Sequence, residues 1–276
     1  MRILVPTDCS DLSAIALKPA LLMAEKFNAT ILALKVINAP VDAVFNTEGE
    51  LIEDEEFDTT QYKKDLKNGN AEILNWASTH HVKVEPLVRT GLMIDTILRV
   101  IENQDIDFVI MNSDRTTGLK KMVHGPIVER IVLNSKVPVL TVKEYFNSFE
   151  HIAFANNFRR LDIRMGFVQK LQEAFNSTLH LVRVNTPRKF MSDNEAIDNM
   201  KALVKKHNLS KVEFHIIKSK KINEGISDFC KIHEIDLMCI GSKQRTGLIS
   251  VMRGCPSKEI VNEMEYPVLT FRSRMK

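Results

Sequence analysis

The most reactive side chains in this sequence belong to four cysteines and eight histidines. Cys255 is flanked by Arg253 and Lys258, and the chain after it is expected to begin a helix. Neighbouring cations and a helix N-terminus lower the pKa of a thiol, so one hypothesis is a redox-sensitive thiolate at Cys255. The other cysteines lie in or beside apolar segments, which predicts small buried residues: Cys9, Cys230 and Cys239. No CxxC pair or ligand spacing occurs, so reduced thiols are expected.

The histidines show none of the spacings by which sequence motifs hold metal ions. No HExxH or zinc-ribbon pattern occurs, and the adjacent pair His80-His81 is expected to point in different directions at a helix end. The chain also lacks GxxxxGKS/T, GxSxG and a GxGxxG after a strand, the motifs of P-loop, serine-hydrolase and dinucleotide enzymes. We therefore predict no metal site and no catalytic residues.

The composition is that of an ordinary globular protein. Of 276 residues, 44% are hydrophobic and 26% are charged, and 38 Lys and Arg against 35 Asp and Glu leave a net charge of +3. That charge is too small to predict nucleic-acid binding. No apolar run approaches the roughly 18 residues that a membrane span needs, and Asp8 interrupts the short apolar N-terminus. We expect no membrane span and no signal peptide, and hence a cytoplasmic protein.

The elements that would position a site are arranged as two copies of one unit. Residues 88–113 align with residues 217–242 without a gap, at an offset of 129 positions, and the similarity continues downstream. Each copy is long enough to form a domain of its own. We predict one domain at residues 1–146 and a second at residues 147–276.

Within each copy, short apolar runs alternate with stretches of helical periodicity. In the first copy the runs predict strands at Ile3–Val5, Thr30–Ile37, Val84–Arg89, Phe108–Asn112 and Val137–Val142. The stretches between them predict helices at Asp11–Phe27 with Ser10 as N-cap, at Thr60–His80 and at Leu92–Asn103. Strands that alternate with helices build a parallel sheet, which binds ligands outside the carboxyl ends of its strands. A site is therefore expected at the loops that follow Val5, Val36, Arg89 and Asn112.

An acidic insertion at about residues 39–62 distinguishes the first copy from the second. Between Asp42 and Asp58 there are eight acidic residues and no Lys or Arg, with apolar residues interspersed. We interpret this segment as a solvated loop that leads into the helix at Thr60–His80. The alternative is a lid or a partner-docking arm that its apolar residues fasten to the domain.

Distinctive blocks stand at the two ends of the repeated unit. The chain opens with ILVPTDCS at Ile3–Ser10 and closes with YPVLTF at Tyr266–Phe271, which follows Gly241-Ser242 and Gly254. Together with the repeat, these blocks resemble a tandem universal stress protein, with two UspA-type domains in one chain. The resemblance implies an α/β fold of two Rossmann-like, flavodoxin-shaped domains, each with a five-stranded parallel sheet covered by helices on both faces.

The same resemblance implies how the two domains associate. In this family the closing strand of one domain commonly pairs with the closing strand of another. Here those strands are Val137–Val142 and Val268–Arg272, and their pairing would make a pseudo-twofold dimer within one chain. Both are apolar edge strands, which are not stable when left exposed.

Nucleotide-binding members of the family carry the loop Gly-x2-Gly-x9-Gly-Ser/Thr, and an Asp at the end of the first strand helps to hold adenosine. Backbone N–H groups of such a loop and a helix N-terminus hold phosphates. The equivalent positions are Asn112, Arg115, Gly125 and Pro126 in the first half and Gly241, Gln244, Gly254 and Cys255 in the second. The Asp is Asp8 in the first half and Asn157 in the second. Each half therefore lacks part of the motif.

These departures predict a weak first-half site and a milder loss in the second. Pro126 has no N–H to donate, and two or three such defects cost about 3–6 kcal/mol, or roughly 10²–10⁴ in affinity. In the second half Cys255 stands where Ser or Thr is usual, which is the alternative interpretation of that cysteine. The candidate nucleotide-binding residues are Gly241, Ser242, Gln244, Gly254, Cys255, Ser257, Asn157 and Val184 in the second half and Thr7, Asp8, Val36 and Gly125 in the first. If either half binds ATP or AMP, we expect it to be the second.

The resemblance implies a non-enzymatic, cytoplasmic protein of the stress response. Our first hypothesis is a regulatory binding protein whose nucleotide sites are degenerate and which acts through protein partners. One alternative is an ATP- or AMP-dependent switch that uses the Gly241–Gly254 loop, and another is a carrier of an apolar ligand between the domains. The sequence names no partner, and it leaves open whether two chains form a homodimer.

Overall fold

The structure is a computed structural model of the 276-residue chain. It describes residues 1–37, 44–45, 51–52, 60–113, 121–143, 146, 148–159, 163, 165–242 and 266–272. Among the helices in these ranges, none combines the length and the apolar character that crossing a bilayer requires.

Strands and helices alternate along both halves of the chain. The elements of the first half are β1 (Arg2–Pro6), α1 (Asp11–Ala14), α2 (Leu17–Phe27), β2 (Thr30–Ile37), β3 (Val44–Phe45), β4 (Leu51–Ile52), α3 (Thr60–Thr79), β5 (Glu85–Thr90), α4 (Met93–Asn103), β6 (Phe108–Asn112), α5 (Lys121–Asn134) and β7 (Val139–Val142). Those of the second half are β8 (His151–Ala155), α6 (Gly166–Phe175), β9 (Thr178–Asn185), α7 (Asp193–His207), β10 (Val212–Lys218), α8 (Ile222–Ile232), β11 (Leu237–Ser242) and β12 (Val268–Arg272). The predicted domain boundary falls between β7 and β8.

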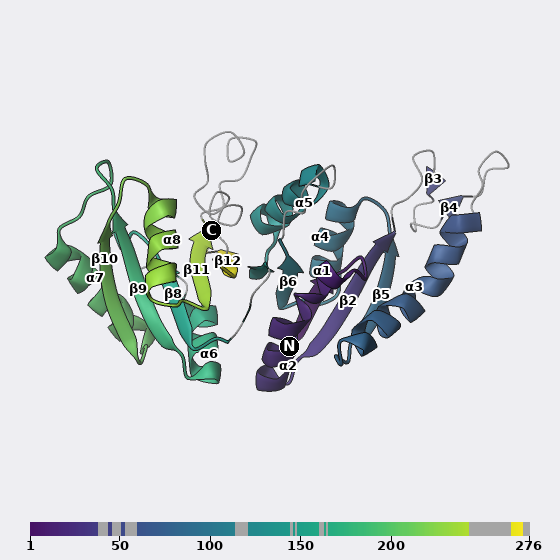
Figure 1. Ribbon diagram of the computed structural model, residues 1–276, viewed down its shortest axis with the longest axis horizontal. Helices are drawn as coiled ribbons and strands as arrows, with labels where there is room; N and C mark the ends of the chain where they lie inside the picture. The colour runs from purple at the N-terminus through teal and green to yellow at the C-terminus, as the bar shows by residue number, and fades with distance from the viewer. Residues whose placement is uncertain are drawn as a thin grey trace.

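Ten strands form one continuous sheet in the order β10-β9-β8-β11-β12-β7-β6-β1-β2-β5. Strands within each half pair in parallel, and the two halves have the same internal order. The halves lie side by side and meet at the middle of the sheet (Figure 1). There β12 pairs with β7 in antiparallel fashion, with Leu269 opposite Leu140. The predicted pairing of the closing strands is therefore present, and it produces the internal pseudo-dimer.

Alternate residues of the strands face opposite layers of helices, because successive side chains of a strand point to opposite faces. In β1, Ile3 and Val5 join an apolar cluster with α2, α3 and α6, whereas Leu4 joins a cluster with α4, α5 and α8. Both clusters extend across the two halves. Aromatic rings add to the junction, since Phe108 of β6 stacks on Phe167 of α6 with ring centroids 4.7 Å apart. The halves are thus joined by packed side chains as well as by the sheet.

The first predicted helix is interrupted. The prediction of one helix at Asp11–Phe27 was wrong, because Ile15 and Ala16 form a turn between α1 and α2. Pro19 explains the break: it has no N–H, and its ring clashes with the carbonyl of the residue four positions earlier, Ile15. The start of the helix is as predicted, with the side chain of Ser10 accepting a hydrogen bond from the backbone N of Ser13 at 3.2 Å.

Most of the acidic insertion lies outside the described residues. Inside it, β3 and β4 form a small antiparallel pair in which Val44 lies opposite Ile52 and Phe45 opposite Leu51. The interpretation of the segment as a solvated loop did not include this pairing, which uses the apolar residues interspersed among the acidic ones. A lid or docking role for the insertion stays a prediction.

Candidate functional site: the loops at the carboxyl edge of the sheet

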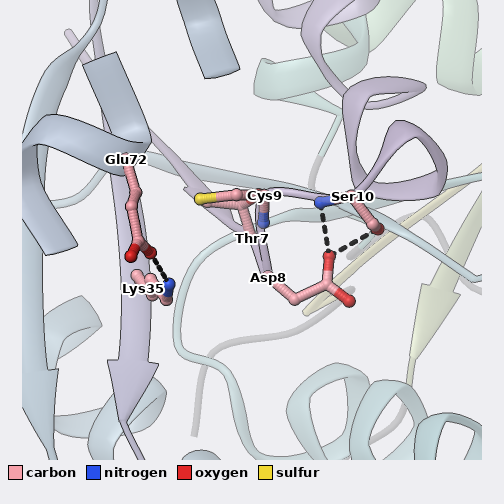
Figure 2. Close-up of polar contacts among 6 residues, drawn as sticks. All are labelled: Thr7, Asp8, Cys9, Ser10, Lys35 and Glu72. Atoms are coloured by element: carbon pink, nitrogen blue, oxygen red, sulfur yellow. Dashed lines mark hydrogen bonds and ion pairs between the residues drawn. The ribbon is translucent and has the colours of Figure 1, made fainter. Parts of the chain in front are cut away.

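The loop after β1 is held in a tight turn by its own side chains. Thr7 is buried, and its Oγ1 accepts a hydrogen bond from the backbone N of Cys9 at 2.8 Å and lies 2.7 Å from Oγ of Ser13. Cys9 has a φ of 62°, in the left-handed region that L-residues seldom adopt. The turn directs the carboxylate of Asp8 toward Ser10 (Figure 2).

Asp8 uses one carboxylate oxygen to fasten this turn. Its Oδ1 accepts from the backbone N of Ser10 at 3.0 Å and from Oγ of Ser10 at 2.5 Å, while the second oxygen points away from Ser10 (Figure 2). Partial burial opposes ionisation, but the hydrogen bonds from Ser10 outweigh it and lower the pKa of Asp8. Asp8 is therefore an exposed carboxylate whose charge is already partly committed.

Beside the turn, two side chains of opposite charge form an ion pair. Lys35 of β2 forms an ion pair with Glu72 of α3, next to Cys9 (Figure 2). Burial raises the pKa of the Cys9 thiol, and the nearby Lys35 ammonium does not reverse the shift. Cys9 is only half-buried, in contrast to the prediction, whereas Cys230 and Cys239 are buried as predicted. The raised pKa keeps Cys9 a neutral thiol at pH 7.

The loop after β8 repeats the same backbone turn with different side chains. The backbone N of Phe158 donates to Oδ1 of Asn156 at 3.1 Å, and the backbone N of Arg159 donates to Oδ1 of Asn157 at 3.1 Å. Phe158 has a φ of 48° and, like Cys9, occupies the left-handed position. The two halves therefore share the turn, with the ionisable Asp8 in the first and the neutral Asn157 at the equivalent position in the second.

Behind the second turn lies a buried arginine that the sequence analysis did not single out. Arg183 of β9 is 1% exposed, and it donates to Oδ1 of Asn185 at 2.9 Å, to the carbonyl of Lys189 at 3.2 Å and to the carbonyl of Asn157. These acceptors are all neutral. Among the residues that the structure describes, no carboxylate oxygen forms an ion pair with Arg183. The available sequence signal was one arginine within the strand segment Thr178–Asn185.

The positive charge at this edge is reinforced from the surface. Desolvation lowers the pKa of Arg183, the nearby Arg159 lowers it further and the nearby carboxylate of Glu195 opposes the shift, but an arginine stays charged at any pH that the folded protein experiences. Arg159, Arg188 and Lys189 are exposed around the same loops, and the guanidinium of Arg159 donates to the carbonyl of Phe190 at 3.1 Å. This edge of the second half is thus suited to an anionic ligand.

The structure places the remaining predicted residues unevenly. Val36 and Val184 lie near the ends of β2 and β9, and Gly241 and Ser242 end β11. Gly125 lies inside α5, where a backbone N–H is used by the helix, and this placement counts against its predicted role in a phosphate loop. Four predicted residues lie outside the described ranges: Gln244, Gly254, Cys255 and Ser257. Their roles, including the redox hypothesis for Cys255, stay predictions.

The carboxyl ends of the strands do bring the predicted loops together. The backbone N of Thr7 donates to the carbonyl of Leu34 at 2.9 Å, which ties the loop after β1 to β2. Asn112, at the end of β6, donates through Nδ2 to the carbonyl of Leu12 at 2.7 Å. In the first half, Asn112 therefore lies next to α1, which follows the Asp8 turn, at the position where the resemblance predicts the first glycine of a phosphate loop.

Comparison with known proteins identifies the family. The model of the universal stress protein family matches residues 1–143 and 165–272. The chain belongs to this family. It is a tandem member, since the matched segments correspond to the two halves described above.

Curated and solved universal stress proteins agree with this assignment. One from Methanocaldococcus jannaschii is 28% identical over 145 residues, which cover 52% of this chain and 82% of the relative. A second from the same archaeon is 27% identical over 152 residues, covering 51% of this chain and 94% of the relative. The crystal structure of a universal stress protein from Archaeoglobus fulgidus has a TM-score of 0.72 with 18% identity, and the similarity covers 99% of this chain and 96% of that one. This last likeness shows the shared two-domain fold.

Proposed function

We propose that this universal stress protein is a regulatory binding protein that acts in the cytoplasm through ligand occupancy and contacts with protein partners, without catalytic turnover. The proposal rests on how Asp8 and Asn157 are hydrogen-bonded in the two turns at the carboxyl edge of the sheet. Asp8 is held by Ser10 and Asn157 by the backbone of Arg159, so both side chains serve the turn itself. Side chains committed in this way shape a binding surface and are poorly placed to transfer protons.

The first domain is the less favourable place for a nucleotide. Asn112 stands where the first glycine of the family loop is usual, and its side chain bonds to the carbonyl of Leu12 at 2.7 Å. A side chain at this position takes space that the backbone of a phosphate loop needs. Lys35, the cation next to the turn, is already paired with Glu72. These observations support a degenerate first site.

A second candidate function is favoured by Arg183. A buried cation whose partners are all neutral leaves a positive potential that an anion can satisfy, and Arg159 adds to it at the surface. On this basis, a switch controlled by ATP or AMP would use the second domain.

The third hypothesis, a carrier of an apolar ligand between the domains, has no supporting observation among the described residues. The junction is a backbone ladder in which Leu140 and Leu269 are fully buried, so side chains fill the space that a ligand would need. The same ladder uses the closing strands of both domains. A homodimer, if it forms, therefore needs another surface of the chain.

The proposal is tested by incubating the full chain with ATP and Mg²⁺ and measuring phosphate release and thermal stability in parallel. We expect no phosphate release above that of buffer. Release that is lost in the variant Asp8→Asn or Arg159→Gln would contradict the proposal, because it would assign turnover to one of these turns.

The rise in Tm on adding nucleotide shows which of the two domains binds it. If ATP or AMP raises the Tm of the wild type, we expect the same rise in Asp8→Asn and a smaller one in Arg159→Gln, an exposed residue whose change should not unfold the protein. The reverse order would assign the nucleotide to the first domain.

A further inference from the structure

Half of the histidines in this protein lie together on one face of the second half of the sheet. His151, His180 and His215 come from the neighbouring strands β8, β9 and β10, and His233 follows α8. His180 is the register partner of Glu213, and His151 is the partner of Thr178. Register partners, and residues two apart in a strand, point to the same face. The sheet register therefore gathers side chains that are far apart in the sequence.

Three of these side chains converge to within the span of a metal ion. Nδ1 of His180 lies 3.1 Å from Nε2 of His215, and Oε2 of Glu213 lies 3.4 Å from each of these nitrogens. All three ligand atoms lie within 4.8 Å of one another. Zinc bonds of about 2.0–2.1 Å in tetrahedral geometry separate neighbouring ligand atoms by about 3.3–3.4 Å. The triangle thus has the dimensions of one face of a zinc tetrahedron.

We propose that His180, Glu213 and His215 form a Zn²⁺ site in the second domain. Two imidazoles and one carboxylate are ligands that zinc commonly takes in proteins. Three protein ligands leave a fourth position to water or to His233, whose ring centroid lies 4.9 Å from that of His215. The site lies away from the turn at Asn157, because His151 begins β8 and that turn follows the end of the same strand.

The surroundings prepare His180 for this role. Its second ring nitrogen, Nε2, lies 3.1 Å from Nδ1 of His151, so a His180 that binds zinc through Nδ1 can donate its Nε2–H to His151. A hydrogen bond of this kind to the second nitrogen fixes the tautomer and the orientation of a metal-bound imidazole.

The three ligands range from buried to exposed. The side chain of His180 is 4% exposed, that of His215 is 18% exposed and that of Glu213 is 56% exposed. A metal ion can therefore enter from the Glu213 side without opening the core. Because β10 is the outermost strand of the sheet, an ion bound between β9 and β10 would fasten that strand to its neighbour.

The experiment is a titration of the tag-free full chain with Zn²⁺, followed by calorimetry and by metal analysis after dialysis. We expect one equivalent of bound Zn²⁺, a rise in Tm, and a loss of affinity of at least tenfold in both His215→Gln and Glu213→Gln. The control variant is His81→Asn, an exposed histidine of the first domain with a left-handed backbone that Asn tolerates. It should bind Zn²⁺ as the wild type does.

A second measurement does not depend on variants. Co²⁺ bound in place of Zn²⁺ should give the intense visible absorption of a tetrahedral site, and Zn²⁺ should displace it. No stoichiometric binding to the wild type, equal binding in His215→Gln, or only the weak absorption of octahedral Co²⁺ would overturn the proposal. None of these outcomes bears on the turns at Asp8 and Asn157, so the proposed regulatory function is tested separately.

Discussion

The equivalent cations of the two domains, Lys35 and Arg183, are used in opposite ways. Both occupy the sixth position of an eight-residue strand, β2 in the first domain and β9 in the second. Lys35 reaches a carboxylate, Glu72 of α3, near the surface. Arg183 is buried and bonds to neutral oxygens, two of them in the loops after β8 and β9. In the first domain the charge of Lys35 is thus neutralised by Glu72. In the second domain the charge of Arg183 has only neutral hydrogen-bond acceptors at the carboxyl edge of the sheet.

The comparison shows that the two turns at the carboxyl edge of the sheet share a backbone conformation but differ in charge. The turns at Asp8 and Asn157 have matching hydrogen bonds and a left-handed residue at the same position. A buried arginine that bridges separate segments is costly to desolvate and is kept only where its hydrogen bonds hold the structure together. We infer that Arg183 both shapes the second edge and prepares it for an anion.

The largest expected difference in unfolding free energy is between variants of the two residues with a left-handed backbone, Phe158 and Cys9. Phe158 is fully buried and packs edge-on against Phe154, with ring centroids 6.0 Å apart, whereas Cys9 is half-buried. We expect Phe158→Gly to lower the free energy of unfolding by about 3–5 kcal/mol through lost packing. For Cys9→Gly, the relief of strain and the added chain entropy nearly cancel, so the change should stay within about 1 kcal/mol. Urea unfolding followed by circular dichroism measures both, and equal effects would contradict the comparison.

The buried arginine should matter more than the exposed lysine. Arg183→Met leaves the carbonyls of Asn157 and Lys189 without the donor that Arg183 supplies, and the amide oxygen of Asn185 keeps only its bond from the backbone N of Met191, which we expect to cost about 3 kcal/mol. Lys35→Met removes a partly exposed ion pair and should cost less than about 1 kcal/mol. The same unfolding measurement applies. A larger cost for Lys35→Met would show that the cations are not used as described.

Features that depend on local pattern were predictable from the sequence. The strands at Thr30–Ile37 and Phe108–Asn112 have the predicted bounds, because a continuous apolar run defines a strand buried on both faces. The antiparallel pairing of β7 with β12 followed from the resemblance and from the cost of an exposed apolar edge. Pro19 could have located the break between α1 and α2, but the helical periodicity on both sides of it concealed the break.

Features that depend on register between strands were not predictable. His180, Glu213 and His215 have no motif spacing, and only the pairing of β9 with β10 brings them together. Arg183 was missed for a similar reason: its three acceptors belong to segments whose approach is set by the folded loops. A sequence analysis that looks for spacing within one segment finds neither group.

Unlike the two carboxyl edges, the junction between the domains is symmetric in its hydrogen bonds. Oγ1 of Thr141 donates to the carbonyl of Val268 at 3.1 Å, and Oγ1 of Thr270 donates to the carbonyl of Val139 at 3.2 Å. Both threonines are buried. We expect Thr141→Val and Thr270→Val each to lower the free energy of unfolding by about 1 kcal/mol, the net value of one hydrogen bond. Clearly unequal effects would mean that the junction has diverged as the ligand edges have.

The smallest expected difference is a dependence on pH that only the first turn should show. Hydrogen bonds from Ser10 lower the pKa of Asp8 in the folded protein, so ionised Asp8 stabilises the fold at pH values above its unfolded pKa of about 3.9. That contribution is lost as the pH falls through the folded value. Because Asp8 is exposed to solvent, screening keeps it below about 1 kcal/mol.

The variant Asp8→Asn gives the first turn the side chain that the second turn already has. The difference in unfolding free energy between wild type and Asp8→Asn should therefore be present at pH 6 and shrink toward pH 3, as measured by urea unfolding across that range. Asn157→Ala is the matched control: it removes the equivalent hydrogen bond to Arg159, but the difference from wild type should not change with pH because an amide does not titrate. A difference for Asp8→Asn that stays constant over this range would mean that the carboxylate charge contributes nothing to the first turn. The two turns would then differ in composition but not in electrostatics, and the contrast between the domains would rest on Lys35 and Arg183 alone.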